Sequence, residues 1–258
     1  QPLMPIAQGK LIAIEGIDGS GKRTQVELLA GALRQRGYSV HQTGFPKYDS
    51  TFGKLIGQFL DGQLGPLETV DPRFTALLYA GDRLEAKPEL DAALNHGQIV
   101  LADRYIGSNL AHQGARTSRE NRDAFIDWIR HVEYSIYGLP REHLVLYLRV
   151  TPEQAQKLVL QKTAREYTSA AQDLQEASIH HLQSAAAVYD QLATQAPWVT
   201  IQCFDSACTV MHSPETIATE ILSVVEPLLS QDAAVQTIGV PADVPQASVA
   251  TTNIPGGG

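Results

Sequence analysis

The 258-residue sequence predicts an α/β fold, a five-stranded parallel sheet with helices on both faces. Five short apolar runs, typical of strands buried on both faces, alternate with segments whose apolar residues recur at helical spacing. The first run leads through a glycine-rich turn directly into a helical segment, the order found at a phosphate-binding P-loop. Strands that alternate with helices in this way favour a parallel sheet.

The P-loop occupies residues 16–22 and follows the apolar run Leu11–Ile14. Its glycines let successive N–H groups turn inward, the helix N-terminus adds partial positive charge, and Lys22 would reach the β- and γ-phosphates. The motif normally continues with Ser or Thr, which ligates Mg²⁺, but here Arg23 follows and Thr24 comes one residue late. Metal binding therefore needs other ligands. The predicted ATP-binding residues are Gly16, Ile17, Asp18, Gly19, Ser20, Gly21, Lys22, Arg23 and Thr24.

The other elements follow from apolar periodicity and from the residues that begin and end them. Gly37 is a normal C-cap for the first helix, and Pro152 takes the favoured first-turn position of another. The remaining strands are expected at 39–45, 98–102, 144–150 and 198–204. Helices are expected at 22–36, 51–60, 74–95, 108–113, 118–137, from 152 onward, at 174–193 and at 214–229.

Three segments are expected to lie outside this regular structure. Residues 1–9 read as a disordered lead to a folded domain at 10–230. The segment 162–171 is polar, carries Arg165 and Tyr167, has no apolar stripe, and is interpreted as a mobile lid. Residues 231–258 contain almost no charge and are rich in Ala, Val, Pro, Gln, Thr and Gly, so a disordered tail is expected there.

Composition excludes several classes of function. A net charge of −8 argues against a nucleic-acid-coating surface, which needs a basic excess. No apolar run approaches the roughly 18 residues of a membrane span, and no basic-then-apolar leader is seen at the N-terminus. The two cysteines are too few for a disulfide framework or a zinc site. We therefore expect a cytoplasmic protein that associates with neither membrane nor nucleic acid.

Charged residues follow the predicted strands where each strand ends, which is where ligands gather in such sheets. Asp103 comes after an apolar strand and reads as a Walker-B-like carboxylate for Mg²⁺, although a helix N-cap is an alternative. Arg104 beside it is interpreted as a clamp for a second phosphate, with a surface ion pair as the alternative. Asp18 and Lys47 occupy corresponding places after other strands.

Four motifs follow one another along the chain: Glu15–Lys22, Phe45-Pro46, Tyr79–Arg83 and Asp103–Ala115. In order and spacing they resemble those of the thymidylate kinases, which transfer the γ-phosphoryl group of ATP to dTMP in dTTP biosynthesis. The resemblance spans about residues 10–230 and implies the P-loop nucleoside monophosphate kinase fold. It extends to Arg23, because one bacterial branch of the family is similar in carrying Lys-Arg-Thr here.

The resemblance implies a role for each matching residue. Tyr79 would stack on thymine, Arg83 would bond its carbonyl, and Tyr167 would cover the deoxyribose. Catalysis would depend on Lys22, Arg23, Asp18, Arg104 and Arg165, with Mg²⁺ held by Asp18 and Asp103. The implied dTMP-binding residues are Asp18, Phe45, Pro46, Lys47, Tyr48, Tyr79, Arg83, Arg104, Ser108, Asn109, His112, Gln113 and Tyr167. A homodimer is also implied, with apolar faces around 55–60 and 74–84 as candidates for the shared surface.

The sequence departs from the family pattern in places. Lys47 stands where arginine is usual, His112 replaces a common tyrosine, and Lys157 and Leu158 stand where an adenine-stacking arginine is often found. Tyr79 could also be an ordinary core residue of a long helix. Two alternatives to a dTMP kinase stay open: a deoxynucleoside kinase, and a catalytically weak nucleotide-binding regulator, which the loss of the P-loop Ser/Thr would favour.

Overall fold

The computed structural model describes residues 9–66, 69–163, 171–205, 207 and 210–237. The expected N-terminal lead, most of the expected lid and most of the expected tail lie outside these residues. The chain divides into two compact units, residues 1–223 and 224–258. All strands and all the predicted site residues that the structure describes belong to the first unit.

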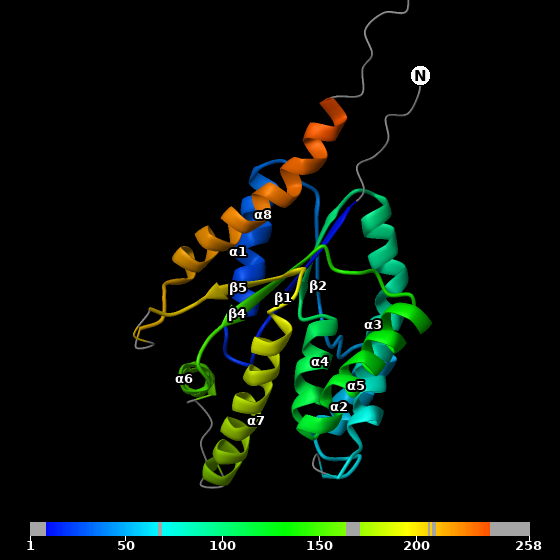
Figure 1. The fold of residues 1–258 in the computed structure, drawn as a ribbon, viewed down its shortest axis with the longest axis vertical. Helices are drawn as coiled ribbons and strands as arrows, with labels where there is room; N and C mark the ends of the chain where they lie inside the picture. The colour runs from blue at the N-terminus through cyan, green and yellow to red at the C-terminus, as the bar shows by residue number, and fades with distance from the viewer. Residues whose placement is uncertain (1–8, 67–68, 164–170, 206, 208–209, 238–258) are drawn as a thin grey trace, which may run out of the picture. The chain divides into compact units, whose positions relative to one another are not determined.

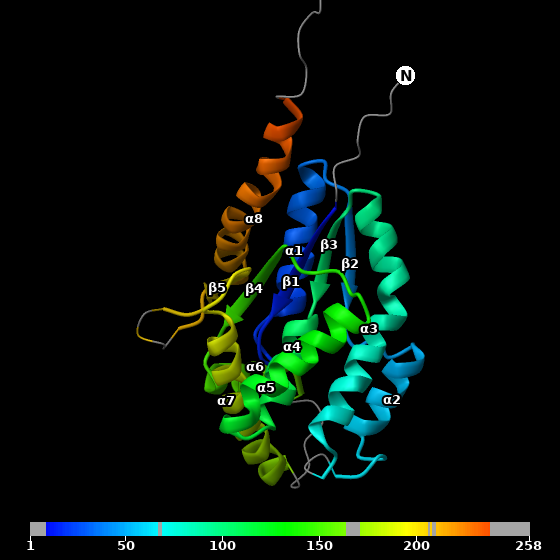
Figure 2. The same ribbon diagram turned by 45° about the vertical axis from the view of Figure 1, so that its right-hand side comes forward.

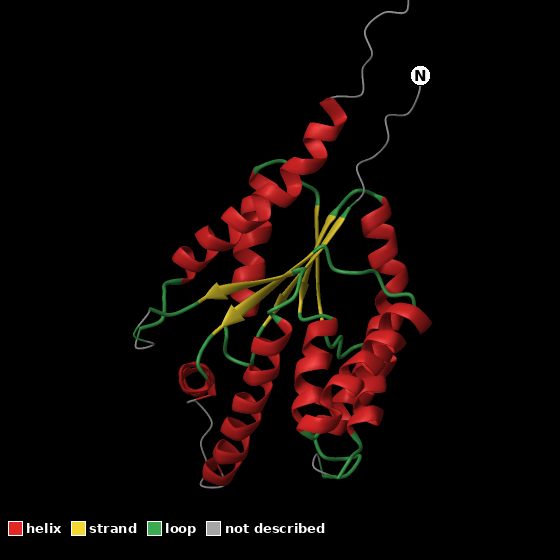
Figure 3. Ribbon diagram, viewed as in Figure 1, coloured by secondary structure: helices red, strands yellow, loops and turns green. Residues whose placement is uncertain are grey.

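A single five-stranded sheet forms the centre of the first unit (Figure 3). Its strands lie in the order β2-β3-β1-β4-β5, and every neighbouring pair is parallel. The predicted fold class is therefore confirmed. Leu11, Ile12, Ala13 and Ile14 of the central strand are fully buried, as their continuous apolar run predicts. The strands are β1 (Lys10–Glu15), β2 (Val40–Gly44), β3 (Ile99–Asp103), β4 (Leu144–Arg149) and β5 (Trp198–Gln202).

Helices cover both faces of the sheet. Figures 1 and 2 show α1 together with the start of α8 on one side, and α3, α4 and α7 on the other. Gln25 of α1 donates to the carbonyl of Pro214 at the start of α8 (3.0 Å), which ties the first pair together. The helices are α1 (Lys22–Gln35), α2 (Thr51–Leu60), α3 (Pro72–Asn95), α4 (Ile106–Ala115), α5 (Arg119–Arg130), α6 (Pro152–Thr163), α7 (Ala171–Leu192) and α8 (Pro214–Thr237).

Side chains and prolines mark the helix starts. Ser50 accepts from the N–H of Gly53 at the start of α2 (2.8 Å), and Asp71 accepts from Arg73 at the start of α3 (2.7 Å). Proline stands at the first position of α3, α6 and α8, where its missing N–H costs nothing. These local signals explain why most predicted helix starts agree with the structure to within a few residues.

Two predicted helices differ from the structure. The helix expected over 118–137 is α5 followed by a π-helical segment, η1 (His131–Ile136), for which the sequence offers no local signal. The last helix was expected to end near residue 229, with a disordered tail from 231, but α8 continues to Thr237. Alanines at 233 and 234 favour helix, and the first breaker, Gly239, comes only later.

Candidate active site

The P-loop lies where β1 ends and α1 begins. Gly16, Gly19 and Gly21 have positive φ angles of 148°, 85° and 85°, a region that side chains avoid. A Cβ on Gly16 would also come within 2.8 Å of the Leu148 carbonyl oxygen. Lys22 folds back over the loop, and its Nζ donates to the carbonyls of Gly16 (3.0 Å) and Ile17 (2.8 Å). The loop therefore holds its lysine against its own backbone.

Burial of Lys22 makes its ammonium easy to deprotonate. Desolvation, together with repulsion from Arg104, lowers the pKa of Lys22 to about 7, against weaker opposing effects of Asp18 and Asp103. Neutral carbonyls accept its hydrogen bonds, so no carboxylate cancels its charge directly. An additional anion at this position would raise the pKa again.

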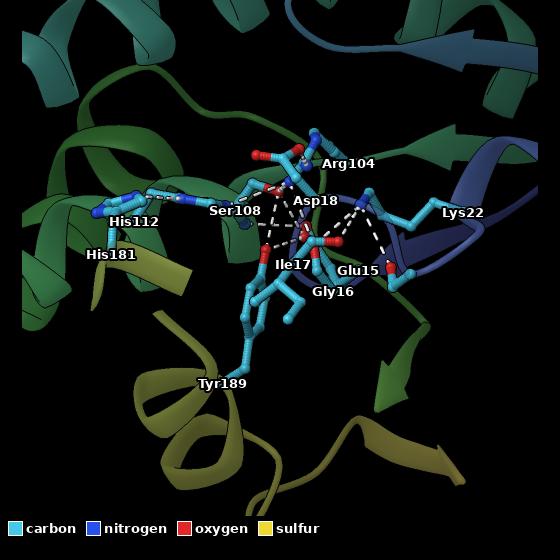
Figure 4. A network of polar contacts seen from close by, with 11 residues as sticks. Glu15, Gly16, Ile17, Asp18, Lys22, Arg104, Ser108, His112, His181 and Tyr189 are labelled. Carbon is cyan, nitrogen blue, oxygen red and sulfur yellow. Dashed lines mark hydrogen bonds and ion pairs between the residues drawn. The ribbon is translucent and has the colours of Figure 1, made fainter. Parts of the chain in front are cut away.

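Arg104 joins the P-loop to the end of β3. Its backbone has a φ of 67°, in the left-handed region, and its N–H donates to the Ile14 carbonyl of β1 (3.0 Å). The guanidinium donates to the Gly16 carbonyl (3.3 Å) and to Ser108 Oγ (3.0 Å) through Nη1, and to Asp18 through Nη2 (Figure 4). Burial acts to lower the pKa of Arg104, but Asp18 raises it above the ordinary value.

Asp18 and Asp103 are the two carboxylates expected to hold metal. Burial acts to raise the pKa of Asp18, but Arg104, followed by His112 and Lys22, holds it well below its ordinary value. The Asp18 side chain is 65% exposed and pairs with Arg104. Asp103 is half-buried, and its carboxylate makes no hydrogen bond or ion pair with any residue that the structure describes. Both side chains therefore keep oxygen atoms available.

Glu15, at the end of β1, is fully buried and has a partner for each carboxylate oxygen. Oε1 accepts from the N–H groups of Tyr105 (2.8 Å) and Ser108 (3.0 Å) at the start of α4, and Oε2 accepts from the hydroxyls of Ser108 (2.6 Å) and Tyr189 (2.9 Å). A carboxylate at a helix N-terminus is favourable. We call Glu15, Asp18, Lys22, Arg104 and Ser108 the P-loop cluster.

Arg23 and Thr24 lie in the first turn of α1, and both are exposed. The Arg23 side chain is 86% exposed and pairs with Glu27 one turn later (3.2 Å). Its predicted contact with phosphate thus requires the side chain to leave Glu27.

The Phe45-Pro46-Lys47-Tyr48 loop leaves β2 beside the P-loop cluster. The buried carboxylate of Asp82 on α3 accepts from the Lys47 N–H (3.0 Å) and from Ser50 Oγ (2.8 Å), and so holds the loop against α3. Phe45 packs on Tyr105 with ring centroids 5.9 Å apart, and Tyr48 is 57% exposed. The Lys47 ammonium, predicted to lie near the dTMP phosphate, instead pairs with Glu89.

A second group of charges is buried between α3, α4 and η1. Arg83 donates through Nε and Nη2 to both oxygens of Glu133 (2.5 and 2.6 Å), and both side chains are almost fully buried. Asn109 also donates to Glu133 (2.8 Å), and its Oδ1 is buried without a partner among the described residues. We call Arg83, Asn109 and Glu133 the α3 cluster. Glu133 raises the pKa of Arg83 against the lowering effect of burial.

Tyr79 and Gln113 lie near the α3 cluster on the same two helices. Tyr79 is half-buried and packs on the apolar cluster of Ile56, Phe59 and Leu78. Burial, followed by the nearby Tyr48, raises the pKa of Tyr79 to about 12. Gln113 is buried, and its Oε1 accepts from Arg116 (3.0 Å). The Tyr79 side chain is therefore partly packed against the core and partly exposed, which is the arrangement that stacking on a base requires.

His112 on α4 adds an imidazole beside Arg104. Its Nε2 lies 3.4 Å from Arg104 Nη1, and its Nδ1 lies 3.1 Å from Nε2 of His181 on α7. Sequence reasoning named His112 but missed His181, as it also missed the roles of Glu15 and Glu133. Of these three residues, only Glu15 could have been recognised from the sequence. A carboxylate at the end of an otherwise apolar buried strand needs hydrogen-bond partners. Arg165 and Tyr167, two predicted site residues, lie outside the described residues.

The described part of the chain also bears on the expectations about membranes and metals. None of its helices is both long and apolar enough to cross a membrane. No group of three or more His, Cys, Asp or Glu side chains within it is arranged to hold a metal ion. A metal at this site would therefore depend on two carboxylates together with ligand oxygens.

Several known proteins of one family are similar to this chain in sequence. The chain is similar to thymidylate kinase of Mycobacterium tuberculosis strain H37Rv, 34% identical over 186 residues, which cover 72% of this chain and 86% of the relative. Human thymidylate kinase is 32% identical over 154 residues, 60% of this chain and 67% of the relative. A probable thymidylate kinase of Pyrobaculum calidifontis is 37% identical over 149 residues, 57% and 68% of the two chains. The family model described as thymidylate kinase matches residues 14–212, and the chain therefore belongs to the thymidylate kinase family.

Proposed function

We propose that this protein is a nucleoside monophosphate kinase that transfers the γ-phosphoryl group of ATP to dTMP and yields dTDP and ADP. One observation carries the proposal: Lys22 and Arg104 both donate to the carbonyl oxygen of Gly16, at 3.0 and 3.3 Å. Lys22 belongs to the nucleotide-binding loop and Arg104 to the next strand end. Phosphates bound to these two cations are therefore neighbours, as transfer between two nucleotides requires.

The P-loop cluster supplies positioning and charge rather than a nucleophile. Lys22 would hold the phosphates of ATP, and Arg104 would hold the phosphate of dTMP. Fixed cations stabilise the charge that develops during transfer, and they do so most strongly where water is excluded. Asp18 keeps Arg104 in place through its ion pair. Ser108, between Glu15 and Arg104, serves the same positioning role.

Mg²⁺ fits the donor chemistry at the end of β1 and β3. Asp18 and Asp103 offer carboxylate oxygens, which Mg²⁺ prefers, and nucleotide phosphates and water would complete its coordination. The unpartnered carboxylate of Asp103 supports this fit, since the described residues do not otherwise use it. When bound, the ion would neutralise phosphate charge during transfer.

The α3 cluster supports thymine recognition. Glu133 uses Nε and Nη2 of Arg83, and Nη1 makes no hydrogen bond among the described residues, so it can donate to a thymine carbonyl. The unpartnered Oδ1 of Asn109 can accept from a base N–H. Tyr79 would stack on the ring, with Gln113 at its edge. Phe45, Pro46, Tyr48 and His112 remain proposed dTMP contacts, and Lys47 would have to leave Glu89 to become one.

ADP release measured with a panel of nucleoside monophosphates, with thymidine alongside, tests the function. We expect turnover with dTMP and none with thymidine. Turnover with thymidine in place of dTMP would favour a deoxynucleoside kinase. ATP binding without turnover on any acceptor would favour a nucleotide-binding regulator. Lys22→Met provides the control, because it removes the P-loop cation and should abolish ADP release with every acceptor.

We further propose that the protein is a homodimer that uses the outer face of α3. Phe74, Leu77 and Leu84 are 50%, 37% and 37% exposed and are separated by three and seven residues, so they share one face of the helix. Light scattering at micromolar concentration should give twice the chain mass of 28.0 kDa. Leu77→Asp should shift the protein toward monomer, whereas Leu28→Asp on α1, with 38% exposure of the native residue, should not. A monomer in the unaltered protein would contradict the proposal.

A further inference from the structure

Two imidazoles, those of His112 on α4 and His181 on α7, lie to one side of Arg104 (Figure 4). The rings of His112 and His181 are stacked with centroids 5.3 Å apart and an interplanar angle of 30°. Tyr189 packs edge-on against His112, with centroids 6.1 Å apart. Polar contacts continue from Arg104 Nη1 to His112 Nε2 (3.4 Å), and from His112 Nδ1 to His181 Nε2 (3.1 Å).

The direction of the hydrogen bonds in this chain is fixed by chemistry. A guanidinium only donates, so His112 Nε2 must accept from Arg104. In a neutral imidazole the proton then resides on Nδ1, which donates to His181 Nε2. His181 in turn must carry its own proton on Nδ1. Each ring therefore adopts the Nδ1–H tautomer, and the tautomer of His112 depends on the acceptor that His181 provides.

Both imidazoles are held neutral, as this arrangement requires. Burial, followed by the charge of Arg104, lowers the pKa of His112 to about 3. Burial also lowers the pKa of His181 below its ordinary value, against an opposing effect of Asp18 and with a smaller contribution from Arg116. A neutral acceptor differs from a carboxylate in one respect that matters here: it orients the guanidinium without cancelling its charge. Among the described residues, Asp18 is the carboxylate that pairs with Arg104.

We propose that His181 is a positioning residue for Arg104, acting through the tautomer of His112. The proposal rests on the function proposed above, in which Arg104 holds the dTMP phosphate. The two hydrogens of Nη1 are shared among three neutral acceptors, Gly16, Ser108 and His112, which together set the plane of the guanidinium. If His181 offers no acceptor, His112 can carry its proton on Nε2 instead of Nδ1. That N–H then faces the N–H donors of Arg104, and the hydrogen bond between the two residues is lost.

Variants at two adjacent histidines separate this role from packing. His181→Phe keeps a ring stacked on His112 but removes the acceptor, and His181→Gln restores an acceptor through its side-chain oxygen. His180→Phe is the matched control, because His180 is exposed and its side chain diverges from that of its neighbour. We expect the KM for dTMP to rise about threefold to tenfold in His181→Phe, the effect of one hydrogen bond. The KM for ATP should stay unchanged, and the other two variants should resemble the unaltered protein.

A second measurement needs no turnover. Nitrogen-15 NMR of the histidine side chains should show His112 as the Nδ1–H tautomer in the unaltered protein and a shift toward Nε2–H in His181→Phe. An Nε2–H tautomer in the unaltered protein, or unchanged dTMP kinetics in His181→Phe, would overturn the proposal. An equal rise in KM for His181→Gln or His180→Phe would also overturn it. Absence of dTMP phosphorylation would instead refute the proposed function, while the tautomer result would still decide whether His181 orients the pair.

Discussion

The P-loop cluster and the α3 cluster both contain opposite charges, but they differ in how far each ion pair is buried. In the α3 cluster, Arg83 and Glu133 are both almost fully buried and form two parallel hydrogen bonds with each other. In the P-loop cluster, Lys22 bonds to neutral carbonyls, and the Asp18 partner of Arg104 is 65% exposed. The charges of the α3 cluster therefore compensate each other, and the cluster holds α3, α4 and η1 together. In the P-loop cluster no carboxylate among the described residues bonds to Lys22, so a polyanionic ligand can bind this cation.

The largest effect should follow from removing the compensation in the α3 cluster. Glu133→Gln leaves the Arg83 guanidinium buried without its counter-charge, and we expect the free energy of unfolding to fall by about 3–5 kcal/mol. Urea denaturation measures the change. Glu27→Gln, which breaks the exposed pair with Arg23, is the control and should cost about 0–1 kcal/mol. Equal losses in the two variants would mean that burial of the Arg83–Glu133 pair does not increase its effect on the free energy of unfolding.

Arg23 tests whether the P-loop cluster extends to the exposed first turn of α1. If Arg23 leaves Glu27 to clamp phosphate in the transition state, Arg23→Ala should lower kcat by about 100-fold, with little change in the KM for dTMP. Leaving an exposed ion pair costs only about 0–1 kcal/mol, so the movement is energetically accessible. Glu27→Ala frees the arginine and should preserve kcat. Near-normal turnover in Arg23→Ala would restrict the catalytic cations to the buried ones.

Tyr79 tests whether the region beside the α3 cluster contacts the base. Tyr79→Ala removes a stacking surface worth about 1–3 kcal/mol, so the KM for dTMP should rise about tenfold to a hundredfold. The KM for ATP should not change, because the proposed ATP site is at the P-loop cluster. Tyr79→Phe keeps the ring and should retain most of the affinity. A similar loss for both variants would assign the effect to the hydroxyl instead.

The smallest expected effect, and the most specific one, is a change in the protonation of Lys22 when nucleotide binds. Its pKa is about 7, so at pH 8 most Lys22 side chains are unprotonated, and bound phosphates should raise the pKa and draw in a proton. Calorimetry of ATP binding in two buffers with different ionisation enthalpies should show uptake of up to about one proton. Lys22→Met should remove the uptake. Because the ordinary pKa is 10.5, Lys22 should also make folding more favourable as the pH rises from about 7 to 10.5.

The sequence predicts those parts of the fold that local pattern determines. Leu11–Ile14 and the loop that follows carry strand, turn and helix signals within about 25 residues, and the structure has each element there. The parallel direction of the strands follows from alternation with helices, whereas their order in the sheet, β2-β3-β1-β4-β5, was not predicted. The π-helical η1 and the extension of α8 to Thr237 were missed, since neither begins or ends at a distinctive residue.

Partners of the site residues are harder to predict than the residues themselves. Arg83 could be named from its motif, but Glu133 lies 50 residues away on a segment without a recognisable pattern. His181 meets His112 across 69 residues, and its neighbour His180 looks the same in sequence. Such pairings depend on how α3, α4, η1 and α7 pack. Packing is decided by the whole fold, so single-sequence patterns carry little information about it.

The left-handed backbone of Arg104 stores conformational strain at the centre of the site. A side chain at a φ of 67° costs about 1 kcal/mol or more, a penalty that glycine escapes. Two requirements therefore conflict at this position: glycine fits the backbone best, but glycine cannot supply a guanidinium. Arg104→Gly should consequently unfold less readily than Arg104→Ala by about 1 kcal/mol, although both lack the proposed phosphate clamp. Retention of arginine here trades folding stability for a cation held in one orientation.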